Sequence, residues 1–327
     1  MRFFFSLIFV LVLALAGVGY DWVNRPMEMP AAGVDLSIEP GSNAQSIASS
    51  VAQAGVRVSP SLLYGWFRIS GQARQIRAGS YELDVQTTPR SLLLKLVQGD
   101  EALRSVTLVE GWTFKQVLAA LAKAQSLQDD AGALDAASLM ARLGKPGVAP
   151  EGRFFPDTYT YAKGSSDIAV LQRAMRSMDK KLDVAWSARG PASVLKTPDQ
   201  VLILASIIEK ETGTANDRAE ISAVFNNRLR IGMRLQTDPT VIYGLGDRFD
   251  GNLRKVDLLT DTPWNTYTRA GLPPTPIAIP GKAALLAAVQ PAASKALYFV
   301  ARGDGSSHFS TSLDEHNRAV NKYQRGQ

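Results

Sequence analysis

Residues 197–212 have the sequence TPDQVLILASIIEKET, which predicts a helix inside a hydrophobic core. Thr197 is a suitable N-cap, Pro198 suits the first helical position, and Gln200 follows the cap by three residues. Residues 201–208 are apolar around most of the helix, a pattern typical of a helix that is buried on nearly all sides. We therefore expect a buried helix over about 198–212.

The last turn of this helix contains two carboxylates, Glu209 and Glu211, on either side of Lys210. Carboxylates there meet the negative end of the helix dipole and apolar surroundings, and both effects raise the pKa of a carboxyl group. General-acid cleavage of a glycosidic bond needs a carboxyl that stays protonated near neutral pH. At about 100° per residue the apolar face points near Glu211, while Glu209 lies on the flank. Burial therefore favours Glu211; the alternative is a solvated helix end.

Polar and aromatic residues gather in two segments after this helix. Beyond a helix expected over 223–229, residues 231–244 place polar side chains next to Pro and Gly, which predicts a loop. Residues 263–268, PWNTYT, predict a second polar loop, and GLPPTPI at 271–277 follows it. Such loops suit sugar hydroxyls and N-acetyl groups. Six residues are predicted to line a cleft and bind substrate, with a purely structural role as the alternative for each: Gln236, Thr237, Asp238, Tyr243, Asn265 and Tyr267.

The N-terminus predicts a membrane segment. Residues 3–20 contain no charge, and as a helix they would be about 27 Å long, near the lower limit for crossing a bilayer. Arg2 precedes the segment and Asp21 follows it, so the positive-inside rule favours a cytoplasmic N-terminus and an exported body. A cleaved signal peptide with an A-x-A site at 14–16 is the alternative. The length of the apolar run favours an uncleaved anchor over residues 1–20.

Composition excludes several classes of protein. The 327 residues are 46% hydrophobic and 20% charged, which is typical of a globular protein. The absence of cysteine excludes disulfide scaffolds, thiol nucleophiles and Cys-type zinc sites, and the two histidines are ill-spaced for a metal, so we expect no metal and no cofactor. The net charge of +6 is spread along the chain without a nucleic-acid motif, so no nucleic-acid partner is expected.

A small module is expected between the anchor and the long C-terminal region. Residues 21–35 lack periodicity and predict a stalk. The elements expected after it are a strand at 35–38, helices at about 43–54 and 61–69, a strand within 76–83 and a helix at 89–99. The pairs at 40–41 and 47–48 and the segment AGSY at 78–81 resemble a LysM-like module, a small fold that holds N-acetylglucosamine polymers. A packing domain without a ligand is the alternative.

Long ordered blocks over nearly the whole chain match one family. The blocks are residues 205–212, 227–229, 235–244, 265–267 and 271–274, with shorter matches at 155–159, 298–300, 308–309 and 315–317. They closely resemble the endolytic murein transglycosylase family, also called YceG-like. The chain departs from the family pattern at 226–227 and 274–275, and neither place touches the acid.

The resemblance implies a single-pass inner-membrane enzyme with its catalytic domain in the periplasm. Its substrate would be the glycan strands of nascent peptidoglycan, cut internally at the β-1,4 link from N-acetylmuramic acid to N-acetylglucosamine, which ends strand elongation. The muramyl 6-hydroxyl would attack its own C1 and leave a 1,6-anhydro end. The family's catalytic residue matches Glu211. The membrane would be contacted through the N-terminal helix, and peptidoglycan synthases are candidate partners.

The expected fold class is α+β. It comprises the transmembrane helix (1–20), the stalk (21–35), a LysM-like βα module (36–104) and a mixed α/β catalytic domain (105–327), whose buried helix presents Glu211 to a cleft between loops. Two other functions stay open. A muramidase-type hydrolase of the same bond would need a second carboxylate, for which Asp238 is the best candidate. A non-catalytic, membrane-anchored protein could instead bind the wall through the LysM-like module.

Overall fold

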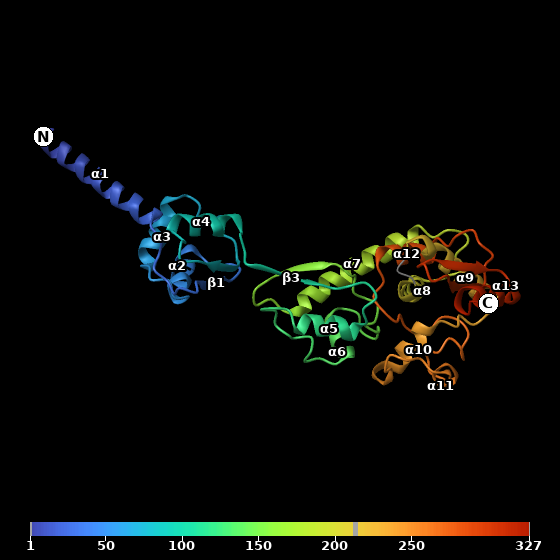
Figure 1. The fold of residues 1–327 in the computed structure, drawn as a ribbon. Coiled ribbons are helices and arrows are strands. Elements are labelled where there is room, and N and C mark those ends of the chain that lie inside the picture. Colours follow the sequence, from blue (N-terminus) through green and yellow to red (C-terminus); the bar gives the residue numbers. More distant parts are fainter. Residues whose placement is uncertain (1, 212–214, 327) are drawn as a thin grey trace. The chain divides into compact units, whose positions relative to one another are not determined.

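A computed structural model describes residues 2–211 and 215–326, and its elements form two compact units. Unit 1 comprises Met1–Arg104 and Thr160–Ser165, and unit 2 comprises Ser105–Tyr159 and Ser166–Gln327. Both mix helices with short strands (Figure 1), so the fold is α+β as expected. Thr212, the last residue of the expected acid-bearing helix, lies outside the described residues.

Unit 1 begins with a long apolar helix and continues as a strand–helix–helix–strand–helix order. Its elements are α1 (Arg2–Asn24), β1 (Val34–Ile38), α2 (Ala44–Gln53), α3 (Pro60–Ile69), β2 (Gly79–Leu83) and α4 (Pro89–Gln98). Within the described residues, α1 is long and apolar enough to cross a membrane, and its side chains are largely exposed. The boundary between the units falls within β3 (Leu103–Thr107) and β4 (Thr158–Ala162), which pair with each other.

The stalk expected over 21–35 is shorter than the sequence suggests. The helix continues through Asp21 to Asn24, because Pro26 is the first residue that cannot extend it. β1 already starts at Val34 and pairs antiparallel with β2, with Leu36 opposite Tyr81. Both of these side chains are buried, so strand alternation places one face of the small sheet in the core of unit 1.

The helices of unit 1 begin where the sequence predicts. The Asn43 side chain accepts from the backbone of Gln45 and Ser46, which caps α2, and Gly55 follows the helix with φ 104°. Leu63 and Phe67 of α3 lie one helical turn apart and are fully buried in the core of unit 1. The same periodicity that predicted these helices therefore decides which of their faces is buried.

Unit 2 is built around α8 (Pro198–Glu211). Its other elements are α5 (Phe114–Ala122), α6 (Ala136–Arg142), α7 (Asp167–Ser187), α9 (Ala215–Arg230), α10 (Asp238–Leu245), a 3-10 turn (Gly246–Arg248), α11 (Lys255–Leu259), α12 (Lys282–Val289), β5 (Tyr298–Ala301), β6 (Ser307–Ser310) and α13 (Leu313–Gln324). β5 and β6 form an antiparallel pair.

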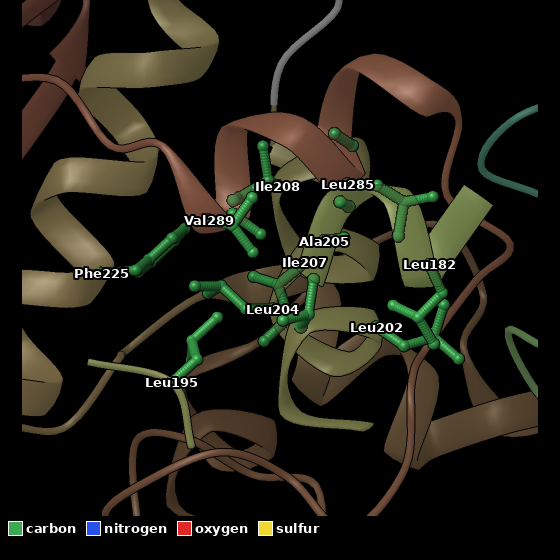
Figure 2. Packing of buried hydrophobic residues seen from close by; sticks show 14 of the residues in the cluster. Leu182, Leu195, Leu202, Leu204, Ala205, Ile207, Ile208, Phe225, Leu285 and Val289 are labelled. Atoms are coloured by element: carbon green, nitrogen blue, oxygen red, sulfur yellow. The ribbon is translucent and has the colours of Figure 1, made fainter. Parts of the chain in front are cut away.

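The expected burial of α8 is confirmed. Thr197 accepts from the Gln200 backbone at 3.2 Å, and every residue from Val201 to Ile208 is buried. Figure 2 shows Leu204, Ile207 and neighbouring residues of this helix enclosed by side chains from α7, α9 and α12. The one buried polar residue of this run, Ser206, donates to the Ile203 carbonyl and accepts from the Ile277 backbone at 3.0 Å.

The prediction of a loop over 231–244 is wrong for the second half of this segment, because α10 begins at Asp238. Thr237 is the N-cap, and Pro239 occupies the first turn, where its missing N–H breaks no helical bond. The density of polar residues masked this helix start. The consequence for the site is that Asp238 stands at the head of a helix rather than in a flexible loop.

Candidate active site

Glu211 ends α8 as a partly buried carboxyl group. The hydroxyl of Thr237 donates a hydrogen bond to its Oε1. Burial raises the pKa of Glu211, and the nearby Asp238 carboxylate raises it further; the Thr237 bond and the Arg228 guanidinium lower it in part. The site therefore holds a carboxyl group with an elevated proton affinity, one oxygen of which has a fixed partner.

Arg228 of α9 is a buried cation beside this carboxyl, and the sequence did not single it out. Its Nε donates to the Leu297 carbonyl and its Nη1 to the Leu235 carbonyl, each at 2.7 Å. Its guanidinium lies over the Tyr298 ring, 5.3 Å from the ring centre, and burial lowers its pKa. Arg228 thus fixes the backbone just ahead of Thr237. The signal that could have found it was an arginine within an otherwise core-facing helix.

The segment before α10 is held against Thr266. Gln236 has a left-handed backbone with φ 49°, and its N–H donates to the Thr266 carbonyl at 3.2 Å. The next N–H, that of Thr237, donates to the Thr266 hydroxyl at 3.1 Å. Thr237 is itself buried, so its hydroxyl donates to Glu211 and not to solvent. The side chain of Gln236, by contrast, is exposed.

Asp238 and Tyr267 form a second polar pair next to the acid. The Tyr267 hydroxyl donates to Asp238 Oδ1 at 2.5 Å. Burial raises the pKa of Tyr267, as do its bond to Asp238 and the charge of Glu211. The structure thus brings together four of the residues predicted from the sequence, Glu211, Thr237, Asp238 and Tyr267.

Asn265 does not belong with them as a substrate-binding residue. Its side chain is fully buried, and its amide donates to three backbone carbonyls, those of Asp257, Leu258 and Thr260. Its Oδ1 accepts from the Tyr267 backbone at 2.8 Å. The prediction that Asn265 contacts substrate is therefore wrong, because every polar atom of the side chain is used to shape the loop that presents Tyr267.

Tyr243 faces a carboxyl that sequence reasoning missed. Its hydroxyl donates to Oε2 of Glu151 at 3.1 Å, and its ring packs edge-on against Trp264 with centres 5.5 Å apart. Glu151 is buried, and its Oε1 accepts from the Phe114 backbone at the start of α5 at 2.9 Å. Burial raises the pKa of Glu151 to about 7. A glutamate two residues before an arginine and a pair of phenylalanines, in EGRFF at 151–155, was the available signal in the sequence.

We expect Glu151→Gln to change how stability depends on pH. The pKa of this group is about 7 in the fold against 4.5 for an ordinary glutamate, so between these values the native state binds more protons than the unfolded chain. The contribution of Glu151 to stability should therefore be largest at the acidic end of this range and fall as pH rises to about 7, by up to about 3 kcal/mol. Denaturant unfolding of the chain in detergent should show a shallower slope in Glu151→Gln than in the wild type, because Glu209 and Glu211 keep their own contributions.

The matched control is Asp314→Asn, which removes an exposed carboxylate at the start of α13. Its pH profile of stability should follow that of the wild type. An unchanged slope in Glu151→Gln would contradict the raised proton affinity of the buried group.

Glu209 differs from Glu211 in what it contacts. Its Oε2 accepts from the Gly281 backbone at 2.8 Å, which joins α8 to the start of α12. Burial raises its pKa as well. The hydrogen-bond partner of Glu209 is a backbone N–H, whereas the groups around Glu211 are the side chains of Thr237, Asp238 and Arg228. In the described residues, no cluster of three or more His, Asp or Glu side chains is placed to hold a metal ion.

Comparison with known proteins gives concordant matches. The model of the YceG-like family matches residues 36–322. The endolytic murein transglycosylase of Bacillus subtilis (strain 168) is 31% identical over 307 residues, covering 89% of this chain and 84% of that protein. The endolytic murein transglycosylase of Streptococcus pneumoniae (strain R6) is 27% identical, and the match covers 96% of this chain and 63% of that protein. A crystal structure of a YceG-like protein from Listeria monocytogenes superposes with a TM-score of 0.56 at 27% identity, covering 88% of this chain and 99% of that one.

Proposed function

This chain belongs to the YceG-like family, and from that premise we propose which bond it breaks and which side chains break it. It is a lytic transglycosylase acting on peptidoglycan, and therefore a lyase. The bond is the β-1,4 link from N-acetylmuramic acid to N-acetylglucosamine in nascent strands, and the new end is a 1,6-anhydro-muramic acid. The observation that supports this most directly is the shielded Glu211 carboxyl, whose burial raises its pKa.

Glu211 would act first as the acid and then as the base. The protonated carboxyl donates its proton to the glycosidic oxygen as the bond from C1 to that oxygen breaks, and the N-acetylglucosamine side leaves with a hydroxyl. The carboxylate then accepts the proton of the muramyl 6-hydroxyl while O6 bonds to C1. Glu211 ends protonated as it began, and the reaction consumes no water.

The neighbouring groups have distinct roles in this scheme. The Thr237 hydroxyl holds Oε1 of Glu211, which leaves Oε2 to meet the sugar oxygen. The Arg228 guanidinium stabilises the carboxylate between the two proton transfers, since its charge favours the ionised form. Asp238, held by Tyr267, would stabilise the positive charge that develops on the sugar ring. Gln236, exposed beside them, would contact substrate.

The remaining parts would place this site at its substrate. We propose that α1 anchors the chain in the inner membrane, with the C-terminal region in the periplasm; its length and apolar exposure support this. Residues 36–104, in which two helices lie between the paired strands β1 and β2, would be a LysM-like module that binds glycan, and residues 105–327 the catalytic domain. Peptidoglycan synthases are the expected partners.

The experiment that tests the reaction is digestion of uncrosslinked glycan strands followed by mass spectrometry of the new ends. Anhydro-muramic ends are expected, with a mass one water lower than that of reducing ends. A hydrolase using Asp238 to position water would give reducing ends and would overturn the transglycosylase mechanism. Binding without cleavage would support a wall-binding anchor instead.

A further inference from the structure

The base of α1 is part of unit 1, not a free tether. Asn24 in its last turn accepts from the Arg90 guanidinium of α4 at 3.5 Å, and Trp22 packs against the hydrophobic core of unit 1. Helices α1 and α4 are in contact, as are α3 and α4. In Figure 1, α3 and α4 lie at the end of unit 1 from which α1 projects. A bilayer that holds α1 is therefore close to these two helices.

The two helices expose apolar side chains. Leu62 and Ile69 lie on one face of α3, separated by seven residues, and are 60% and 84% exposed. Leu94 of α4 is 41% exposed, four residues after Arg90, which places both on one face of that helix. The buried face of α3, with Leu63 and Phe67, points elsewhere. These outer apolar residues are thus not needed for the core of unit 1.

The charges on the same helices are all positive. Neither α3 nor α4 contains Asp or Glu, and together they contain Arg68, Arg90 and Lys95. Arg68 donates to the Tyr64 hydroxyl at 3.3 Å and Arg90 to the Asn24 amide, contacts that do not neutralise their charge. Only Lys95 faces a carboxylate, Asp100 at 3.6 Å, among the described ion pairs. Exposed apolar residues flanked by arginine match a surface of anionic phospholipid.

We propose that the outer face of α3 and α4 (Leu62, Ile69 and Leu94, with Arg68 and Arg90) lies on the anionic lipid surface of the membrane that anchors α1. The proposal rests on the anchoring proposed above, and it adds that unit 1 sits on the bilayer rather than reaching freely away from it. Trp22 at the base of α1 fits the same interface, where tryptophan is enriched. The occupant is lipid because the helix that must enter lipid is continuous with this surface.

The experiment uses the full chain in vesicles of zwitterionic and anionic phospholipid. The protein has no cysteine, so single variants Leu62→Cys, Ile69→Cys and Leu94→Cys can each be labelled with one environment-sensitive fluorophore. Leu11→Cys in α1 reports insertion of the anchor, and Ser46→Cys, an exposed site on α2, is the matched control in unit 1. Nitroxide on the lipid headgroups should quench the three surface labels at least about twofold more than the Ser46→Cys label.

The possible results distinguish lipid contact by α3 and α4 from membrane insertion of α1. If Leu11→Cys is shielded by lipid but the three surface labels behave like Ser46→Cys, the inference fails while the anchor stands. If the Leu11→Cys label is not shielded either, both proposals fail. Shielding that grows with protein density without nitroxide quenching would assign the face to a second copy and overturn the lipid assignment. Arg68→Gln with Arg90→Gln should weaken the quenching in anionic vesicles and not in purely zwitterionic ones.

Discussion

Glu211→Gln should abolish strand cleavage, with a fall in kcat of about 10³-fold or more, because the same carboxyl supplies the proton and later removes one. The amide is close in shape, can still accept from the Thr237 hydroxyl, and relieves the cost of a shielded ionisable group. The variant should therefore fold as well as the wild type. Mass spectrometry of glycan strands measures the loss, and thermal unfolding checks the fold.

The matched control for this loss is Glu209→Gln, two residues earlier on the same helix. The amide oxygen can replace the carboxylate as acceptor for the Gly281 N–H, and the side chain contacts none of the polar groups beside Glu211 that the structure describes. We expect cleavage close to that of the wild type. A fall in kcat of much less than about 10³-fold in Glu211→Gln, or an equal loss in Glu209→Gln, would refute the assignment of the acid.

The second large effect is expected at Arg228. Arg228→Met should lower the free energy of unfolding by about 3 kcal/mol, because the carbonyls of buried Leu235 and half-buried Leu297 lose their charged donor. Loss of the bond to Leu235 should also release the backbone before Thr237, so kcat should fall even under conditions where the variant is folded. Denaturant unfolding and strand cleavage measure the two effects separately.

Two substitutions define the cause of that effect. Arg228→Lys keeps the charge but not the guanidinium fork that reaches both carbonyls, so its stability should lie between those of Arg228→Met and the wild type. Arg230→Met removes an exposed arginine from the same helix and should cost less than about 1 kcal/mol. If Arg228→Met were as stable as Arg230→Met, the hydrogen bonds of Arg228 would not hold the loop.

The α-helices of the two units were largely predictable because their signals are local. The cap at Thr197 with Pro198 and the continuous apolar run after it placed α8 correctly in the core. The start of α10 has no such unambiguous local signal. The Asp-Pro step at 238–239 fits both a turn and a first helical turn, and only packing of α10 against α8 decides between them.

The types of residue in the candidate site were predictable from the sequence, but the hydrogen-bond partners of each side chain were not. Polar loops suggested Thr237 and Tyr267, but nothing local distinguishes them from Asn265, whose amide is used entirely by backbone carbonyls. The role of a polar side chain depends on which atoms surround it, and those atoms come from segments far apart in the sequence. Glu151 illustrates this, since its partners Phe114 and Tyr243 lie 37 and 92 residues away.

By itself the sequence determined the apolar N-terminal helix, the buried α8 and the placement of Glu211 at its end, because hydrophobic periodicity and capping act over a few residues. Tertiary structure alone decided which groups surround that carboxyl. Thr237, 26 residues further along the chain, reaches it, and Arg228 sets the loop from which Thr237 comes. Burial and hydrogen bonding set the proton affinity of a carboxyl group, and both depend on contacts that form only when distant segments pack together.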